Sequence, residues 1–221
     1  MAEIGRYSLI SERECIALVS VLDSKRSDWL PNKLGCNNYF TLGRCVYLDL
    51  SGMREGKNSY YKNIEYSNKL LLECFPYLYK KLIIFFSNIL NDKISYHNNY
   101  AMPGFHIFYQ PGIDIAAKEE PHVDLQHMRV NWKLERDKCE TISFTIPLEL
   151  PRNKGGLDVW FDGHKHTEEP IYHEYNIGNI FVQKGVIVHR IANTYYNSSS
   201  DRRITIQGHL IKLEGIWYMY W

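Results

Sequence analysis

Paired cysteines are missing from this sequence. Its 221 residues include five cysteines, an odd number, and no two of them form a Cys-x-x-Cys motif. This scatter is not typical of a disulfide framework, and it predicts free thiols in a reducing compartment. We therefore expect a cytoplasmic protein. The five residues are Cys15, Cys36, Cys45, Cys74 and Cys139.

Long apolar runs and blocks of like charge are also missing. The strongest apolar run, residues 82–86, is far too short to span a bilayer, and no stretch near the N-terminus resembles a secretory signal. The formal net charge is only +1, which gives no electrostatic reason to expect nucleic acid. We therefore expect neither a membrane nor a nucleic-acid partner, and a monomer or homodimer.

The composition is that of an ordinary globular protein. Hydrophobic residues make up 45% and charged residues 23%, and the length of 221 suits a single domain. Residues 1–95 predict a helical layer, in which Ser11 and Glu14 form a capping-box pattern before a helix. A longer apolar pattern with helical spacing ends at residue 90, and Pro76 should kink or split it. Residues 40–50 alternate and predict a strand.

After Asn91 the pattern changes to short alternating segments separated by glycine and proline. This spacing is typical of an antiparallel sandwich or barrel, and helices that precede strands are expected to cover one outer face of a sheet. The predicted fold is therefore mainly β with N-terminal helices. The predicted strands are residues 105–110, 141–148, 157–161, 170–175, 180–183, 186–191, 202–211 and 216–221.

Two ligand types for a metal ion stand two residues apart at His122 and Asp124. In an extended chain such residues point to the same side, so both can bind one ion. His189 follows a run of apolar β-branched residues and is a third candidate, although alone it would more often be a core histidine. Two imidazoles and one carboxylate suit ferrous iron better than a closed structural zinc site. His127 is an alternative third ligand, but in an extended chain it has the opposite parity.

The strand predicted at residues 202–211 separates polar from apolar side chains. If its apolar face meets the helices, the polar face lines the interior. A buried arginine needs a fixed anion, and a guanidinium beside a hydroxyl is a natural receptor for a carboxylate. Arg203 and Thr205 form such a pair, with Arg202 as the competing arginine. The polar face carries Arg203, Thr205, Gln207 and His209, and the apolar face carries Ile204, Ile206 and Leu210.

The order His122-x-Asp124, His189, Arg203-x-Thr205 resembles the signature of the iron(II)/2-oxoglutarate-dependent oxygenases. The match covers about residues 100–211, and three further segments resemble landmarks of the hydroxylase branch of this family. The resemblance implies a double-stranded β-helix, also called a cupin-like jelly roll, within a single oxygenase domain over residues 1–221 whose core is residues 96–221. The three segments are Tyr-Gln-Pro-Gly at 109–112, Gly-Gly-Leu at 155–157 and Gly-Asn-Ile-Phe-Val at 178–182.

The resemblance also implies a reaction. His122, Asp124 and His189 would hold Fe(II), and 2-oxoglutarate would chelate the iron as cosubstrate beside O2. Its decarboxylation to succinate and CO2 would generate the oxidant for an unactivated carbon. Relatives that halogenate typically carry a small residue at the carboxylate position. The presence of Asp124 therefore favours hydroxylation or a related oxidation.

The far carboxylate of 2-oxoglutarate would lie on Arg203 and Thr205, and Tyr109 is a further candidate for this contact. A purely structural role for Tyr109 in the core is an equally good alternative to this contact.

The substrate is predicted least sharply. The absence of peptide-binding or nucleic-acid extensions favours a small molecule, either an amino acid or a specialised metabolite. His127, Arg129 and Trp132 lie in a polar and aromatic segment that predicts a substrate-binding lid or, equally, a solvated connection. Two alternatives remain: a peptide or protein hydroxylase of prolyl-hydroxylase type, and a metal-binding cupin-like module without oxygen chemistry.

Overall fold

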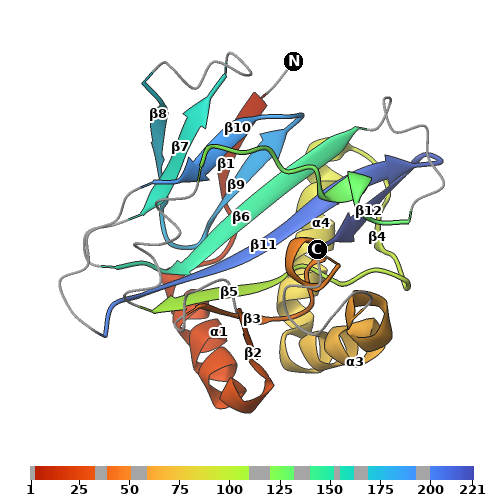
Figure 1. Ribbon diagram of the computed structural model, residues 1–221, viewed down its shortest axis with the longest axis vertical. Helices are drawn as coiled ribbons and strands as arrows, with labels where there is room; N and C mark the ends of the chain where they lie inside the picture. The colour runs from red at the N-terminus through yellow and green to blue at the C-terminus, as the bar shows by residue number, and fades with distance from the viewer. Residues whose placement is uncertain are drawn as a thin grey trace.

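The computed structural model describes residues 3–32, 39–50, 59–109, 120–131, 140–151, 155–161, 169–192 and 200–221. Within these residues more of the chain lies in β-strands than in helices, and the α-helices all lie before residue 91 (Figure 1). The helices are α1 (Glu12–Ser24), α2 (Val46–Asp49), α3 (Ser59–Cys74) and α4 (Pro76–Leu90), with 3-10 turns η1 (Arg26–Asp28) and η2 (Gln126–Met128). The strands are β1 (Glu3–Ser8), β2 (Leu30–Pro31), β3 (Tyr39–Leu42), β4 (Ile94–Tyr96), β5 (Gly104–Tyr109), β6 (Thr141–Glu149), β7 (Gly156–Trp160), β8 (Ile171–Glu174), β9 (Asn179–Lys184), β10 (Val188–Ile191), β11 (Arg202–Leu213) and β12 (Ile216–Tyr220).

Two sheets of unequal size face each other. The large sheet has nine strands in the described residues, with the order β1-β9-β6-β11-β5-β3-β2; in addition, β12 pairs with β11, and β4 pairs with β12. The small sheet has the order β10-β7-β8 and lies at the upper left of Figure 1. Leu157 and Val159 of the small sheet share a buried cluster with Phe181 of the large one, so the two inner faces are in contact.

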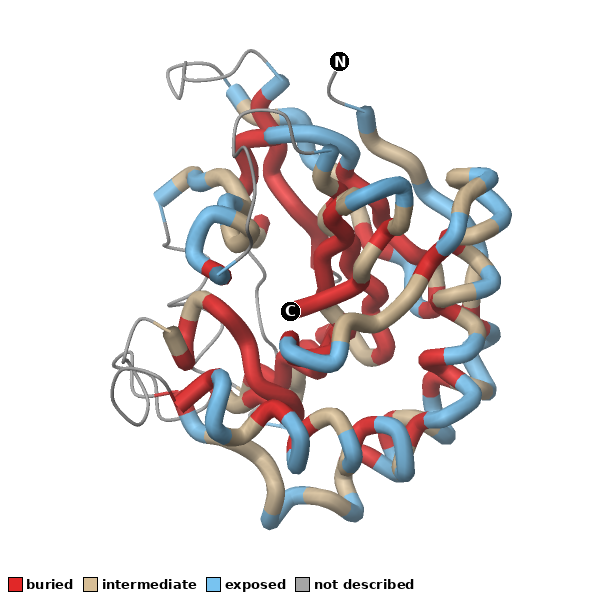
Figure 2. The backbone as a smooth tube through the Cα atoms, turned by 90° about the vertical axis from the view of Figure 1, so that its right-hand side faces the viewer, coloured by how far each residue is buried: buried red, intermediate tan, exposed pale blue. Residues whose placement is uncertain are grey.

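Helices α1, α3 and α4 cover the other face of the large sheet, and the main hydrophobic core lies between them (Figure 1). The apolar face of β11 contributes Ile204, Ile206 and Leu210 to this core, each with no exposed surface. Buried and exposed segments alternate along the helices in Figure 2, as expected for helices with one face on a sheet. The predicted arrangement, with helices against the apolar face of this strand, is confirmed.

Local sequence signals account for the ends of the helices. The capping box at the start of α1 is present, with Ser11 N donating to the Glu14 carboxylate at 2.8 Å and Glu14 N donating to Ser11 Oγ at 3.3 Å. Pro76 stands in the first turn of α4, and the apolar pattern that ends at residue 90 is therefore split into α3 and α4. Asn91, with φ 49°, ends α4 in the left-handed region.

The strand predicted at residues 40–50 is largely wrong, because only Tyr39–Leu42 is extended and α2 follows. Gly43 interrupts the strand with φ +108°, a backbone conformation that other residues rarely adopt. The Asp49 carboxylate then accepts hydrogen bonds from Cys45 N at 2.8 Å and Arg44 Nη1 at 3.1 Å, which stabilises a helical turn.

The strands predicted after residue 91 match β5 to β12 within a few residues, whereas β1, β2 and β4 were not predicted. β1 pairs with β9, but its residues are mostly exposed and polar. Polar and apolar residues do not alternate along it, so the sequence pattern does not indicate a strand. Within the described ranges, Cys15 and Cys74 are free thiols, and none of the helices there combines the length and the apolar character that a membrane span requires.

Candidate metal centre

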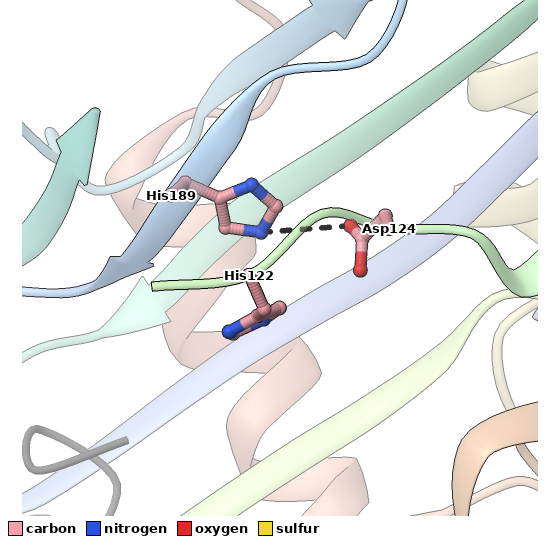
Figure 3. A group of neighbouring side chains, drawn as sticks. All are labelled: His122, Asp124 and His189. Atoms are coloured by element: carbon pink, nitrogen blue, oxygen red, sulfur yellow. Dashed lines mark ion pairs between the residues drawn. The ribbon is translucent and has the colours of Figure 1, made fainter. Parts of the chain in front are cut away.

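The two candidate histidine ligands are held next to each other by the backbone. His122 N donates to the His189 carbonyl at 2.9 Å, and His189 N donates to the His122 carbonyl at 2.8 Å, forming an antiparallel bridge. His189 lies on β10, on the inner face of the small sheet, opposite Val159 of β7. The chain before Asp124 is thus tied to the small sheet, and Asp124 lies beyond it (Figure 3).

Both imidazoles are oriented by the same kind of hydrogen bond. Nδ1 of His189 lies 3.0 Å from the Ile187 carbonyl, and Nδ1 of His122 lies 3.1 Å from the Glu120 carbonyl. Since a carbonyl only accepts, each Nδ1 carries the proton and each Nε2 keeps its lone pair for a metal ion. His189 Nε2 is 3.7 Å from Asp124 Oδ2, and one ligand atom from each of the three residues lies within 4.8 Å of the others (Figure 3).

The electrostatics favour an anionic carboxylate at Asp124 beside a neutral imidazole at His189. Burial alone would raise the pKa of Asp124, but His189, His209 and His122, together with a hydrogen bond from Ser143, hold it at about 2. Burial lowers the pKa of His189, which keeps its imidazole neutral and able to bind a metal. A set of two nitrogens and one carboxylate fits a divalent transition metal and leaves other coordination positions open.

The far end of the ligand-bearing segment is also fixed. Asn131 N donates to the Tyr61 hydroxyl at 3.1 Å, and the Tyr100 hydroxyl donates to the Asn131 carbonyl at 3.3 Å. Val130 is buried in a cluster with aromatic residues of α3 and β12. The segment is therefore held at both ends, which restricts where Asp124 can lie.

Arg203 lies on the inner face of β11 in an aromatic pocket. Its guanidinium is 5.7 Å from the ring centres of both Phe108 and Tyr175, and the residue is only 2% exposed. Among the described residues, Arg203 Nε, Thr205 Oγ1 and the Tyr175 hydroxyl are buried without a hydrogen-bond partner. A buried guanidinium with donors left over fits a ligand carboxylate.

Tyr175 connects this pocket to the metal centre. Burial raises its pKa to about 12, and Arg203 and Thr145 oppose that shift whereas the charge of Asp124 adds to it. Its ring centre lies 5.7 Å from the Arg203 guanidinium, and the charge of Asp124 also acts on the pKa of its hydroxyl. Neither Tyr175 nor Thr145 was among the predicted site residues.

Arg202 and Tyr109 lie on the opposite side of the sheet. Arg202 donates to both oxygens of Asp23 at 2.7 and 2.8 Å and to Glu149 at 2.7 Å. The Tyr109 hydroxyl accepts a hydrogen bond from Arg26 at 3.1 Å. Tyr109 pairs with Arg202 in the β5–β11 register, so it shares the outer parity. The structure therefore separates Tyr109 from Arg203, and Phe108 and Tyr175 lie beside the Arg203 guanidinium instead.

The predicted substrate residues are only partly described. His127 lies in η2 and burial lowers its pKa, whereas Arg129 is exposed just after that turn. Trp132 lies outside the described residues. The cluster of possible ligands in the described chain contains His122, Asp124 and His189 and does not include His127.

Comparison with known proteins finds similar folds but no similar sequences. No protein-family model matches the chain, and no curated protein matches it in sequence. The chain is similar to the solved structure of an N-substituted L-amino acid dioxygenase from Burkholderia ambifaria AMMD in complex with alpha-KG. The TM-score is 0.53 and the identity 15%, covering 99% of this chain and 86% of that one.

Two further solved structures give lower scores. EvdO2 from Micromonospora carbonacea var. aurantiaca, complexed with 2-oxoglutarate, has a TM-score of 0.49 and 13% identity over 95% of this chain and 86% of that one. A Pseudomonas putida prolyl-4-hydroxylase has a TM-score of 0.47 and 13% identity over 96% of this chain and 93% of that one. The likeness to the Burkholderia dioxygenase confirms the predicted fold, a mainly β jelly roll with helices on one outer face.

Proposed function

We propose that this chain is an Fe(II)- and 2-oxoglutarate-dependent oxygenase. The observation that carries the proposal is the pairing, between the two sheets, of an open three-ligand cluster with a buried arginine that has no carboxylate partner among the described residues. A closed structural metal site needs a fourth protein ligand and no nearby anion receptor. A metal centre that also binds a dicarboxylate needs both features found here.

Each side chain has a task that its own contacts support. His122, Asp124 and His189 would hold the iron through two Nε2 atoms and one carboxylate, because both Nδ1 atoms are already engaged with carbonyls. Arg203 and Thr205 would bind the far carboxylate of 2-oxoglutarate. When bound, iron and 2-oxoglutarate would use O2 to oxidise a carbon of the substrate, with release of succinate and CO2.

The walls of the site differ in polarity, which suits this use. The large sheet presents polar side chains inward, and the small sheet presents Leu157, Val159 and Ile191. The apolar wall excludes water from the reacting atoms, while the polar wall binds the charged cosubstrate. We propose a small-molecule substrate, an amino acid or a specialised metabolite. The resemblance in fold to an N-substituted L-amino acid dioxygenase supports starting with amino acids.

A spectroscopic titration tests the proposal without knowledge of the substrate. Fe(II) and 2-oxoglutarate are added anaerobically to the full chain, and a weak visible charge-transfer band is expected. The band should be lost in His189→Ala and kept in His97→Ala, a matched histidine change outside the cluster. A folded wild-type protein that binds iron without giving the band would instead favour a cupin-like module.

Succinate release then separates the substrate classes. With air admitted, the wild-type enzyme is assayed against a panel of free and N-substituted amino acids, other small metabolites and proline-containing peptides. Substrate-dependent succinate is expected from one of the small molecules. Stimulation by the peptides alone would favour the prolyl-hydroxylase type of function.

A further inference from the structure

The two histidine ligands are attached to the rest of the protein in series. β10 follows β9 after residues 185–187, yet β9 belongs to the large sheet and β10 to the small one. In the described chain, the backbone of β10 pairs with β7 on one side and, on the other, only with His122, through the bridge to His189. The position of both imidazoles therefore depends on how firmly β10 is held against β7 (Figure 1).

A set of side-chain contacts spans β10 and β7 directly beside His189. Arg190 and Asp158 are opposite each other in the antiparallel register, one step along from the pair of His189 and Val159. Arg190 Nε donates to Asp158 Oδ2 at 3.1 Å, and the Arg190 guanidinium lies 5.4 Å from the centre of the Trp160 ring. Arg190, Asp158 and Trp160 form what we call the β10 clamp.

The surroundings of the β10 clamp restrict its movement. The side chains of Asp158 and Arg190 are 13% and 30% exposed and Trp160 is 7% exposed, so the ion pair is screened less than one on an open surface. A guanidinium is planar, and a hydrogen bond at its edge together with an aromatic ring at its face fixes its orientation. Strand alternation puts the clamp on the outer face of the small sheet, so it can hold β10 without entering the metal site.

We propose that Arg190 is a positioning residue, which holds His189 and His122 in place for metal binding by fixing β10 against β7. Each imidazole is oriented by a carbonyl of its own segment, at Ile187 and Glu120, and this contact fixes the ring only relative to its own backbone. The backbone register between β10 and β7 is four pairs long, and the charged pair of the clamp reinforces it beside the ligand. Contacts behind the ligands of a metal site typically raise its affinity. The inference rests on the proposed function only in that it requires a divalent metal at the three-ligand cluster.

Co(II) is a suitable probe because its visible absorption reports both affinity and ligand geometry, without turnover. Arg190→Gln removes the ion pair, and we expect the full chain to bind Co(II) roughly 10-fold more weakly and with a changed spectrum. Asp158→Ala should have the same effect, and the double variant should bind no more weakly than either single variant, since both changes break one contact. Arg190→Lys keeps a cation opposite Asp158, so its affinity should return to within about threefold of wild type.

A matched control separates positioning from stability. Arg202→Gln breaks another arginine–aspartate pair, on the outer face of the large sheet, and should lower stability but leave the Co(II) affinity unchanged. Urea denaturation of the metal-free proteins measures the stability of each variant, and Asp158→Ala decides the matter if Arg190→Gln does not fold. Wild-type affinity and spectrum in the clamp variants, or an equal loss of affinity in Arg202→Gln, would overturn the positioning role and leave the proposed function intact. Failure of the wild type itself to bind Co(II) would overturn both.

Discussion

Arg202 and Arg203 are neighbours on β11, yet their surroundings have opposite characters. Arg202 points to the helical side and donates three hydrogen bonds, to Asp23 and Glu149, which raise its pKa. Arg203 points between the sheets, lies against two aromatic rings and forms no ion pair with any described residue. Strand alternation alone puts the two guanidinium groups on different faces.

The difference shows on which face of β11 the polar groups are paired within the protein, and on which face they are left for a ligand. On the outer face the charge is neutralised by the chain's own carboxylates, and Ile206 packs in a dry core. On the inner face Arg203 and Thr205 keep buried donors without partners among the described residues. Leaving such groups unpaired costs free energy, so their presence is explained by a ligand that pairs them. Each of the following changes tests one side of this comparison.

The largest effect is expected on the outer face. Ile206 has no exposed surface, and Ile206→Ala should lower the free energy of unfolding by about 3 kcal/mol because it leaves a cavity in the core. Urea denaturation measures this loss. Binding of 2-oxoglutarate to the folded fraction should stay within about twofold of wild type, since ~0.4 kcal/mol corresponds to that factor. A large loss of affinity in well-folded protein would show that the two faces are not independent.

The next effect is expected on the inner face. Arg203→Gln removes a charge-assisted, two-pronged contact to the far carboxylate, so 2-oxoglutarate should bind roughly 100-fold more weakly. The anaerobic charge-transfer band, titrated with 2-oxoglutarate, measures the change. Arg202→Gln is the matched control and should bind the cosubstrate as wild type does. Equal losses in the two variants would remove the distinction between the arginines.

The sequence predicts the features that depend on the spacing of polar and apolar residues along one segment. Alternation along residues 202–211 separates Arg203 from Ile204 and Ile206, and the i, i+2 spacing puts His122 and Asp124 on one side. Both patterns are local, and hydrophobic burial enforces the first, because a slip by one residue would expose the core face of β11. The split at Pro76 is equally local, since proline suits only the first turn of a helix.

What the sequence does not predict depends on register between distant strands. Tyr109 faces outward because it pairs with Arg202, and no pattern within β5 reveals that pairing. Tyr175 follows the end of a short strand, and its place beside Arg203 arises from the packing of the two sheets. The helical turn of α2 replaces a strand because Gly43 and the Asp49 carboxylate act together, an interaction invisible to period alone.

A smaller effect with a defined pH dependence is expected for Arg202→Gln. The hydrogen bond from Arg202 lowers the pKa of Asp23 below its usual value of about 3.9. A lowered folded-state pKa stabilises the protein above the unfolded pKa, and this contribution is lost as the pH falls through the folded value. We expect the variant to be about 1–2 kcal/mol less stable at pH 7, after allowance for the partial exposure of Asp23.

Denaturation at a series of pH values checks this pH dependence of stability. The gap in stability between wild type and Arg202→Gln should be constant above about pH 5 and should narrow below about pH 4, as Asp23 becomes protonated in the wild type. Asp23→Asn is the matched change on the partner and should show the same narrowing. A gap that stays constant down to pH 3 would exclude Asp23 as its source.

The smallest change should move stability and affinity in opposite directions. Thr205 is fully buried and its hydroxyl has no described partner, so Thr205→Val removes an unsatisfied polar atom at nearly constant volume. The metal-free protein should gain about 1 kcal/mol of stability, while 2-oxoglutarate, which uses that hydroxyl, should bind about fivefold more weakly. Urea denaturation and the charge-transfer titration measure the two quantities on the same preparation. Thr205→Ser, which keeps the hydroxyl, should retain affinity but lose stability through the missing methyl group. If Thr205→Val loses stability as well, the hydroxyl serves the fold, and the inner face is as complete as the outer one.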